Sequence, residues 1–542
     1  MAIDATLVSA VHSIQSLLNS PSDIDDNTEV SFQCAKLILR ATRKSPDTVT
    51  AYIQLNILSK TYASFCQRYL LILGLLSLRG QINEHYAQHL IAAVALAGSL
   101  RKKSDSQSFR HVVAVLRKKG LADWLPLIKM HSRACQNERL RYIAMPGLTR
   151  GERFILYSGI MAASMPRRSA YDTLSLCLRV CYPLYRDELT QFYGFPVRYP
   201  AGTSARYRHQ RTLVVATNAS QRAIWLENDD KPFRWVNVSA LTAAGRQPYN
   251  FKKWASCHQT LDRYLPLSPA INWPYPPAFQ VHRPPQSLVD IIDLLADPDI
   301  EVSRLAEAVE AEPHFAGVLK QSASSDNRLN ISVTDVKQAV MTYGLDRVGD
   351  ILIQQTLLQR LSQRHFPLES VCRQFCQVVA LIAQQLALTT NSGLTPQRAG
   401  LLATFLTAPL MTLPRLKMTR SLPLGQSHFF NINHLLGYKL SQPVSDLAIA
   451  LLRGWHQSAQ HQAIFHYAGK LPESVNREMQ PTYCILMLAL QLARFWLYPP
   501  RTHCTVSEQF QSQAGHVLNL TESQLMAIKN NILAELYCAL PN

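Results

Sequence analysis

Apolar residues recur every three to four positions through most of the chain, which is the period of helices that bury one face. This pattern predicts helices over residues 30–195 and again over residues 286–497, where almost no strand pattern interrupts it. Thr521-Glu-Ser-Gln524 has the sequence of a capping box, which marks the start of a further helix. The buried face of that helix would consist of Leu525, Ile528, Ile532, Leu533 and Leu536.

The pattern changes within residues 212–239. Three short runs there, 212–216, 222–226 and 233–238, are rich in Val, Ile, Trp and Phe, which favour strands. Turn-forming segments at Asn218-Ala-Ser and Glu227-Asn-Asp-Asp separate the runs, and this predicts a small antiparallel meander. Because three strands alone are marginally stable, we expect the meander to pack on neighbouring helices.

Seven prolines fall within residues 264–285. Proline lacks an amide hydrogen and clashes with the preceding helical turn, so this segment is predicted to be an extended connector. The chain then has a helical N-terminal region (1–200), a small β-containing segment (201–263), the connector (264–285), a helical domain (286–497) and a C-terminal tail with a helix (498–542). The predicted fold class is mainly α, with a helical N-terminal region, a small antiparallel β meander and then an all-α bundle.

Composition restricts the class of protein. The 542 residues suffice for two to four domains, and the apolar share of 47% is typical of globular proteins and excludes collagen-like or disulfide-dense chains. The N-terminus lacks the apolar core of a secretory signal, and the apolar stretches are shorter than the ~20 residues needed to cross a bilayer. Eleven scattered cysteines without a CxxC spacing suit a reducing compartment. We therefore expect a cytoplasmic protein without membrane insertion.

Positive charge is concentrated in one part of the chain. The formal net charge is +18, and residues 101–250 hold 25 Lys/Arg against 10 Asp/Glu. Such a segment attracts phosphates, and Tyr207 and Trp235 could stack on bases. Three interpretations stay open: a solvated surface, a contact for an acidic protein partner, or a nucleic-acid interface. The candidate contact residues are Arg101, Lys102, Lys103, Arg117, Lys118, Lys119, Arg208 and Arg211.

Several short motifs follow one another in the second half. They are Leu288-Val-Asp-Ile-Ile-Asp-Leu-Leu-Ala-Asp297-Pro298-Asp299, Ser303-Arg-Leu305-Ala306, Glu312-Pro313, Ile331-Ser332, Tyr343-Gly344-Leu345, Ala450-Leu-Leu-Arg-Gly-Trp455 and Ala463-Ile464-Phe-His466. In this order they resemble the HDOD domain, an all-α output module derived from HD-type metal phosphohydrolases. The resemblance covers roughly residues 281–480 and implies an all-α bundle. Glu312-Pro313 departs mildly from the Asp-Pro of the family.

The resemblance also implies where a hydrolase of this kind would hold its metal. The first histidine would fall near Phe375, and the His-Asp pair at Leu406-Thr407 or, in a second register, at Ala403-Thr404. None of these positions is His, Asp or Glu, the residues whose nitrogen and carboxylate oxygen atoms bind divalent metals. The resemblance therefore implies a degenerate site with no metal, no cofactor and no catalysis. Its implied function is bacterial signal transduction by protein–protein contact.

Two other function classes have less support in the sequence. A nucleic-acid-binding regulator would use the basic segment 101–250. An enzyme with a site in residues 30–270 lacks any motif, because the glycines form no phosphate-binding loop and no nucleophile elbow is present. His85 and His89 have a spacing that could hold a metal on one helix face, but no third ligand lies nearby in the sequence.

Overall fold

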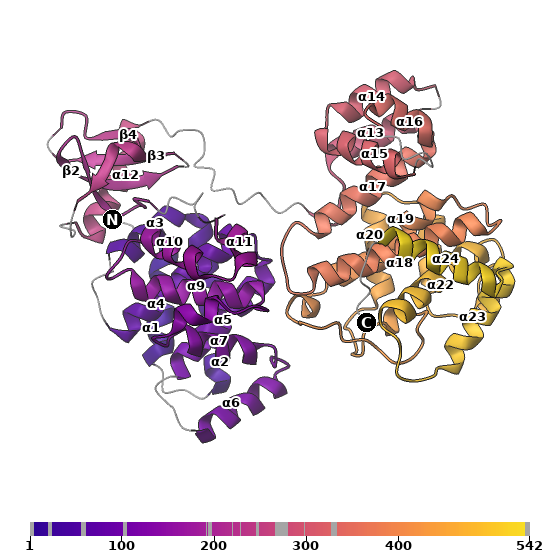
Figure 1. Cartoon of the computed structure of the whole chain (residues 1–542), viewed down its shortest axis with the longest axis horizontal. Coiled ribbons are helices and arrows are strands. Elements are labelled where there is room, and N and C mark those ends of the chain that lie inside the picture. Colours follow the sequence, from indigo (N-terminus) through magenta and orange to yellow (C-terminus); the bar gives the residue numbers. More distant parts are fainter. Residues whose placement is uncertain are drawn as a thin grey trace. The chain divides into compact units, whose positions relative to one another are not determined.

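The computed structural model divides the chain into two compact units, Met1–Pro277 and Ala278–Asn542 (Figure 1). The described residues are mainly helical, with 24 helices and one five-stranded sheet, which confirms the predicted fold class. The division falls within the predicted connector 264–285, of which residues 266–279 lie outside the described part, as do Pro298, Ile331 and Ser332. The structure describes residues 5–19, 24–55, 61–100, 106–190, 192, 198–218, 220–227, 229–244, 249–265, 280–297, 299–326 and 333–536.

Helices α4 (Tyr62–Arg79) and α5 (Glu84–Leu100) are the core of the N-terminal unit, because both are buried along most of their length. Helix α2 (Ile24–Lys44) packs on both of them, and α9 (Arg150–Ser164) packs on α4. Helix α9 begins at a capping box in which Thr149 and Glu152 exchange hydrogen bonds. The other helices of this unit are α1 (Ala5–Asn19), α2 (Ile24–Lys44), α3 (Pro46–Leu55), α6 (Ser106–Lys118), α7 (Trp124–Ala134), α8 (Arg139–Ile143), α9 (Arg150–Ser164), α10 (Ala170–Val180), α11 (Arg186–Thr190) and α12 (Phe251–Tyr264), with 3₁₀ turns at Pro183–Tyr185 and Val238–Ala240.

The sheet of the N-terminal unit contains β1 (Ser204–Tyr207), β2 (Gln210–Thr217), β3 (Gln221–Leu226), β4 (Phe233–Asn237) and β5 (Leu241–Ala243). All pairs are antiparallel, and the strand order is β4-β3-β2-β1-β5. The predicted antiparallel meander is confirmed in β2, β3 and β4, but the number of strands was wrong. The sequence pattern missed β1 and β5 because they are short and contain few of the residues that favour strands. Both become strands by pairing with each other, and β1 also pairs with β2.

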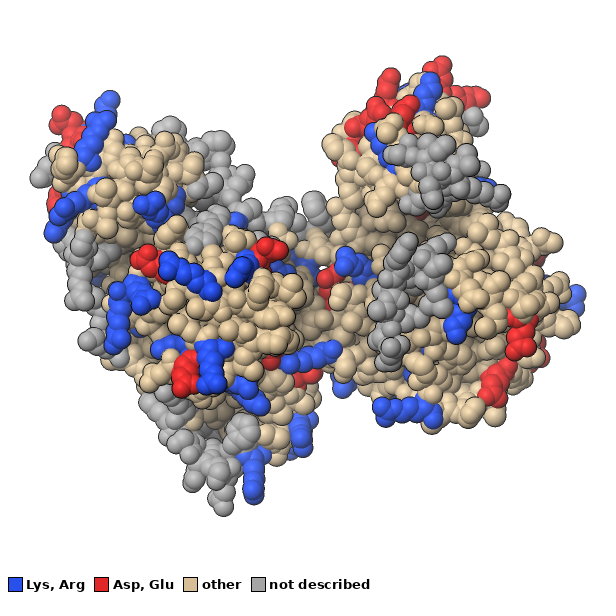
Figure 2. All heavy atoms as spheres, in the orientation of Figure 1, with Lys and Arg blue, Asp and Glu red and all other residues tan. Residues whose placement is uncertain are grey.

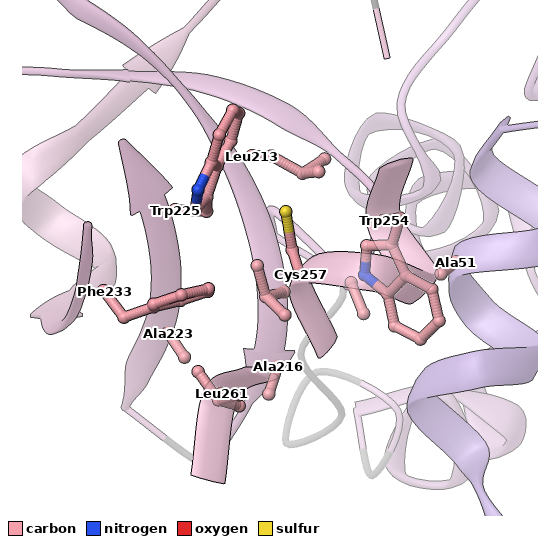
Figure 3. Close-up of a cluster of buried hydrophobic side chains, with 11 residues drawn as sticks. Ala51, Leu213, Ala216, Ala223, Trp225, Phe233, Trp254, Cys257 and Leu261 are labelled. Carbon is pink, nitrogen blue, oxygen red and sulfur yellow. The ribbon is translucent and has the colours of Figure 1, made fainter. Parts of the chain in front are cut away.

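One face of the sheet packs against α12, and Figure 3 shows buried side chains from both. Helix α12 contributes Trp254, Cys257 and Leu261, which recur at three-to-four spacing. Ala51 of α3 joins the same cluster, so the sheet also packs on the helical part of the unit. The expected packing of the meander on neighbouring helices is therefore confirmed. The sheet residues of the cluster are Leu213, Val215, Ala216, Ala223, Trp225 and Phe233.

The opposite face of the sheet encloses a second, smaller cluster. Each of the five strands contributes at least one buried side chain to it. Because the edge strands β4 and β5 meet in the same cluster as the central strands, the sheet curls around these side chains. The cluster consists of Ala205, Val214, Ile224, Leu226, Val236 and Leu241.

A buried carboxylate ties the sheet to α3. Asp47 accepts hydrogen bonds from the hydroxyl of Thr217 at 2.6 Å and from the amide of the same residue at 3.2 Å. Burial raises the pKa of Asp47 to about 6, although the Thr217 bonds and the charge of Arg222 act to lower it. The chain entering the sheet also approaches α3 closely, since a Cβ at Gly202 (φ +84°) would lie 2.7 Å from the Cα of Ala51.

Asp47→Asn is expected to change how the stability of the N-terminal unit depends on pH. The native state holds this proton up to about pH 6, whereas the unfolded state releases it near the ordinary value of 3.8. Stability contributed by the proton is therefore lost as the pH rises through the folded-state pKa. Between pH 5 and 7 the wild type should lose about 1 kcal/mol relative to the Asn variant, as measured by urea unfolding. The exposed Asp230→Asn is the control, and parallel profiles for wild type and Asp47→Asn would contradict the prediction.

Helix α18 (Glu369–Thr389) is the core of the C-terminal unit and packs against α19 (Pro396–Thr407) and α22 (Gln480–Leu497). Among the described helices, α18 alone is long and apolar enough to cross a membrane, but core helices of soluble proteins pass the same test. The closing helix α24 (Glu522–Leu536) follows the predicted capping box, whose first and last residues exchange hydrogen bonds. The other helices are α13 (Gln286–Leu295), α14 (Val302–Glu310), α15 (Pro313–Asp326), α16 (Val336–Tyr343), α17 (Leu345–Leu361), α20 (Val444–Gly454), α21 (Ala459–His466) and α23 (Thr505–Leu518), with 3₁₀ turns at Ala408–Met411, Arg415–Lys417, Ile432–His434 and Pro472–Ser474.

Helices α13–α16 form a group that joins the rest of the unit through α17 (Figure 1). Helices α14, α15 and α16 pack on one another, and α17 contacts α13, α15 and α16. Gly344, with φ +75°, ends α16 and directly precedes α17, so the two helices need no longer loop between them. The motifs at the start of the resemblance lie in this group.

Candidate functional site

The positions at which the resemblance would place metal ligands lie in the core of the C-terminal unit. Phe375 of α18 and both Leu406 and Thr407 of α19 are fully buried. The Thr407 hydroxyl donates to the carbonyl of Ala403 at 2.9 Å, and it lies close enough to Cys376 of α18 to act against the rise in the pKa of that thiol. Burial nevertheless raises the pKa of Cys376 to about 12, so the thiol is neutral at pH 7. These side chains hold the helices together and present no charged ligand to a cation.

The second register, Ala403-Thr404, is also buried. The hydroxyl of Thr404 donates to the carbonyl of Gly400 at 2.8 Å and accepts from Nε2 of Gln354 at 2.9 Å. Nε2 of Gln354 also donates to the Gly400 carbonyl at 3.3 Å. The polar groups at this position are therefore neutral and bonded to one another.

A buried carboxylate one helical turn before Gln354 is paired with an arginine. Oδ2 of Asp350, which is 3% exposed, accepts a hydrogen bond from Nε of Arg398 at 2.8 Å. Burial, helped by the charge of Arg398, lowers the pKa of His461 to about 4. The positive charge of Arg398, which lies beside Asp350 and His461, disfavours the binding of a metal cation there. In the part of the chain that the structure describes, no group of three or more His, Cys, Asp or Glu side chains could hold a metal ion.

A Gly-Trp pair at the end of α20 holds the segment that precedes α13. The indole Nε1 of Trp455 donates to the carbonyl of Val281 at 2.8 Å, across 174 residues of sequence. Gly454 leaves room for the carbonyl oxygen of His282, which would lie 2.1 Å from a Cβ at this position. The guanidinium of Arg360 donates to two further carbonyls of the same segment. The Gly-Trp pair belongs to one of the motifs of the HDOD resemblance, but the motif by itself does not indicate these contacts, because their partners lie far away in the sequence.

The described part of Ala278–Asn542 is an all-α bundle, and this defines the structural class of the C-terminal unit. Residues 281–462 match the HDOD domain family, which confirms the resemblance over that part of the chain.

Two solved structures are similar to the chain. An HDOD domain protein of unknown function from Geobacter sulfurreducens is 14% identical, with a TM-score of 0.33, over 46% of this chain and 92% of that one. The MmoQ response regulator from Methylococcus capsulatus strain Bath is 16% identical, with a TM-score of 0.25, over 45% of this chain and 95% of that one. No curated protein matches the sequence.

The structure divides the candidate basic residues into separate groups. Residues 101–103 lie outside the described residues. Arg117 and Lys118 are exposed at the C-terminal end of α6. Lys119, next along the chain, forms an ion pair with Asp25 of α2 at 2.9 Å, so its charge is already partly neutralised.

The remaining two candidates, Arg208 and Arg211, lie on the β1–β2 hairpin and are exposed. Figure 1 places α6 and the sheet at opposite ends of the N-terminal unit. Figure 2 shows Lys and Arg side chains at the end that carries the sheet. The five described candidates therefore do not form one patch, and the hairpin has to be considered by itself.

His85 and His89 belong to the packed interior of the N-terminal unit. Their rings lie 4.5 Å apart, and Nδ1 of His89 accepts a hydrogen bond from Nε1 of Trp124 at 3.0 Å. The ring of Phe32 contacts His89 edge-on at 4.8 Å. Burial, with a smaller effect of His85, lowers the pKa of His89 to about 3. This imidazole is a neutral hydrogen-bond acceptor in an aromatic cluster.

Proposed function

We propose that the protein is a non-catalytic regulator that acts through its HDOD domain by contact with a protein partner. The observation that supports this most is the burial of Phe375, Leu406 and Thr407, which stand where the resemblance places the ligands of a phosphohydrolase. A metal-dependent hydrolase needs an open coordination position that water and substrate can reach. The side chains at these positions are packed into the helix interface instead.

We propose that the protein works in the cytoplasm. Cysteines within the described residues are all free, which fits a reducing compartment. Most of them are buried, and burial raises the pKa of Cys372 and Cys484 as well as that of Cys376. Such thiols are poor nucleophiles, so they act in packing rather than in chemistry.

The full-length protein is expected to carry no stoichiometric metal and to hydrolyse no phosphodiester. Metal analysis after purification in the presence of Mn²⁺, together with an assay on bis(p-nitrophenyl) phosphate, measures both. Stoichiometric metal combined with hydrolysis would overturn the non-catalytic proposal.

The same proposal predicts that a protein partner binds the C-terminal unit. Met341 and Leu388, 63% and 64% exposed, are the most exposed large apolar side chains described in this unit. A partner identified with the wild-type chain should bind less tightly to Met341→Lys or Leu388→Lys. Leu184→Lys in the N-terminal unit, where the side chain is 80% exposed, is the matched control. If Met341→Lys and Leu388→Lys bind the partner as tightly as the wild type while Leu184→Lys binds it less tightly, the contact lies in the N-terminal unit instead.

A further inference from the structure

We infer that the β1–β2 hairpin and the start of α12 form a binding surface for single-stranded nucleic acid. The surface consists of Arg206, Arg208, Arg211, Tyr249 and Lys253 and is called the hairpin surface below. It belongs to the N-terminal unit, so the inference does not rest on the function proposed for the HDOD domain. Three observations carry it: a pair of facing arginines, a strained turn and an aromatic ring near the cations.

Two arginines of the hairpin surface lie directly opposite each other on neighbouring strands. Arg206 of β1 and Arg211 of β2 are paired in register, and both are exposed. Like charges directly opposite in a sheet are destabilising. Within the described residues neither guanidinium has a hydrogen bond or an ion pair, whereas Arg234 of the same sheet is paired with Asp229. An anion between the two arginines would remove the repulsion.

The turn between the two strands has an unusual sequence for its conformation. Tyr207 pairs with Gln210, which leaves Arg208 and His209 as a two-residue turn. Their φ angles are +45° and +70°, in the left-handed region that turns of this kind usually fill with Asn-Gly. Two larger side chains occupy it here, and both are exposed. Strain of this kind is concentrated at functional positions, and here it projects Arg208 and His209 from the tip of the sheet.

An aromatic ring continues the hairpin surface towards α12. Tyr249 is half-buried and lies edge-on against Trp225 of β3, with ring centroids 5.9 Å apart. Nζ of Lys253 lies 4.2 Å from the centroid of the Trp225 ring. Burial and the nearby charge of Glu227 raise the pKa of Tyr249, and Arg211 is close enough for its charge to oppose that rise. Arg211 of the hairpin and Lys253 of α12 therefore lie near an aromatic pair whose outer ring, Tyr249, is partly exposed.

This combination favours single-stranded nucleic acid over other anions. Unpaired bases have planar faces that stack on an aromatic side chain while the phosphates contact Lys and Arg. A duplex keeps its bases stacked inside, and an acidic polypeptide has carboxylates but no base to stack. Single-stranded RNA and DNA share the required chemistry, and the experiment has an arm for each.

The test is fluorescence anisotropy with the full-length protein and labelled oligonucleotides of about 20 nucleotides, as single-stranded RNA, single-stranded DNA and duplex DNA. Four cations should give a slope of log affinity against log salt of about −3. Arg206→Gln/Arg211→Gln should reduce that slope by about half. Tyr249→Leu should weaken binding about tenfold through lost stacking.

The matched control is Arg117→Gln/Lys118→Gln, which removes the same charge from the end of α6. It should leave affinity and slope unchanged, and Arg208→Gln is a second variant of the hairpin surface should the double variant fold poorly. Flat titrations, or equal losses in the control and the hairpin variant, would overturn the inference. Displacement by polyglutamate that is insensitive to Tyr249→Leu would assign the surface to an acidic protein, and tighter binding of the duplex would exclude the single strand.

Discussion

Gly454→Ala is expected to destabilise the C-terminal unit by about 3 kcal/mol. The added Cβ would lie 2.1 Å from the carbonyl oxygen of His282, and a backbone carbonyl cannot rotate away as a flexible side chain can. Moving this segment would also break the hydrogen bond between Trp455 and Val281, which contributes about 1 kcal/mol. Scanning calorimetry of the full chain measures the loss, and hydrogen exchange of α18 assigns it to this unit.

Gly317→Ala is the matched control for this substitution. Gly317 lies inside α15 of the same unit, and nothing lies within 4 Å of a Cβ built there. Alanine is a better helix former than glycine, so this variant should be more stable by about 0.5–1 kcal/mol. Equal effects of the two substitutions would show that the contact with His282 does not hold the segment in place.

The N-terminal unit is expected to lose about 3 kcal/mol of stability from one histidine when the pH falls to 4. The pKa of His89 lies near 3 in the folded protein, against an ordinary value of 6.5. Between these values the unfolded state binds a proton that the native state excludes, so stability is lost as the pH falls below 6.5. Each unit of difference corresponds to about 1.4 kcal/mol. The effect of Asp47 has the opposite sign and is smaller.

His89→Asn separates this effect from general acid unfolding. The Asn carbonyl oxygen can accept the hydrogen bond from Trp124 but does not titrate. The variant should be less stable than the wild type at pH 7, because the smaller side chain leaves space beside Phe32, yet urea unfolding should show a flatter loss below pH 6.5. The exposed His12→Asn serves as the control. If the free energy of unfolding of His89→Asn falls with pH as steeply as that of the wild type, the acid sensitivity arises from other groups.

Much of the fold could be predicted because it depends on local periodicity. The helical regions, the closing capping box and three strands all have patterns within a few residues of one another. The two missed strands have none: β1 is Ser-Ala-Arg-Tyr and β5 is Leu-Thr-Ala, and each is a strand only because a partner lies beside it. Pairing with a neighbouring strand, and not the strand propensity of their residues, therefore makes β1 and β5 strands.

The contacts that position the candidate sites were beyond sequence reasoning for the same reason. Asp47 resembles an acid in the first turn of a helix, but its partner Thr217 is 170 residues away. Gly454 belongs to a recognisable motif, but the motif does not indicate that the backbone of His282 packs against this glycine. For the basic residues the sequence was misleading in the opposite way. Lys118 and Arg211 belong to the same basic segment of the sequence, but α6 and the hairpin lie at opposite ends of the N-terminal unit.

The curled sheet has a consequence for self-association. Its edges are β4 and β5, which are five and three residues long, and short edges give other chains little unpaired backbone on which to add a strand. Templated aggregation through this sheet is thereby discouraged, even though it carries exposed side chains on its hairpin.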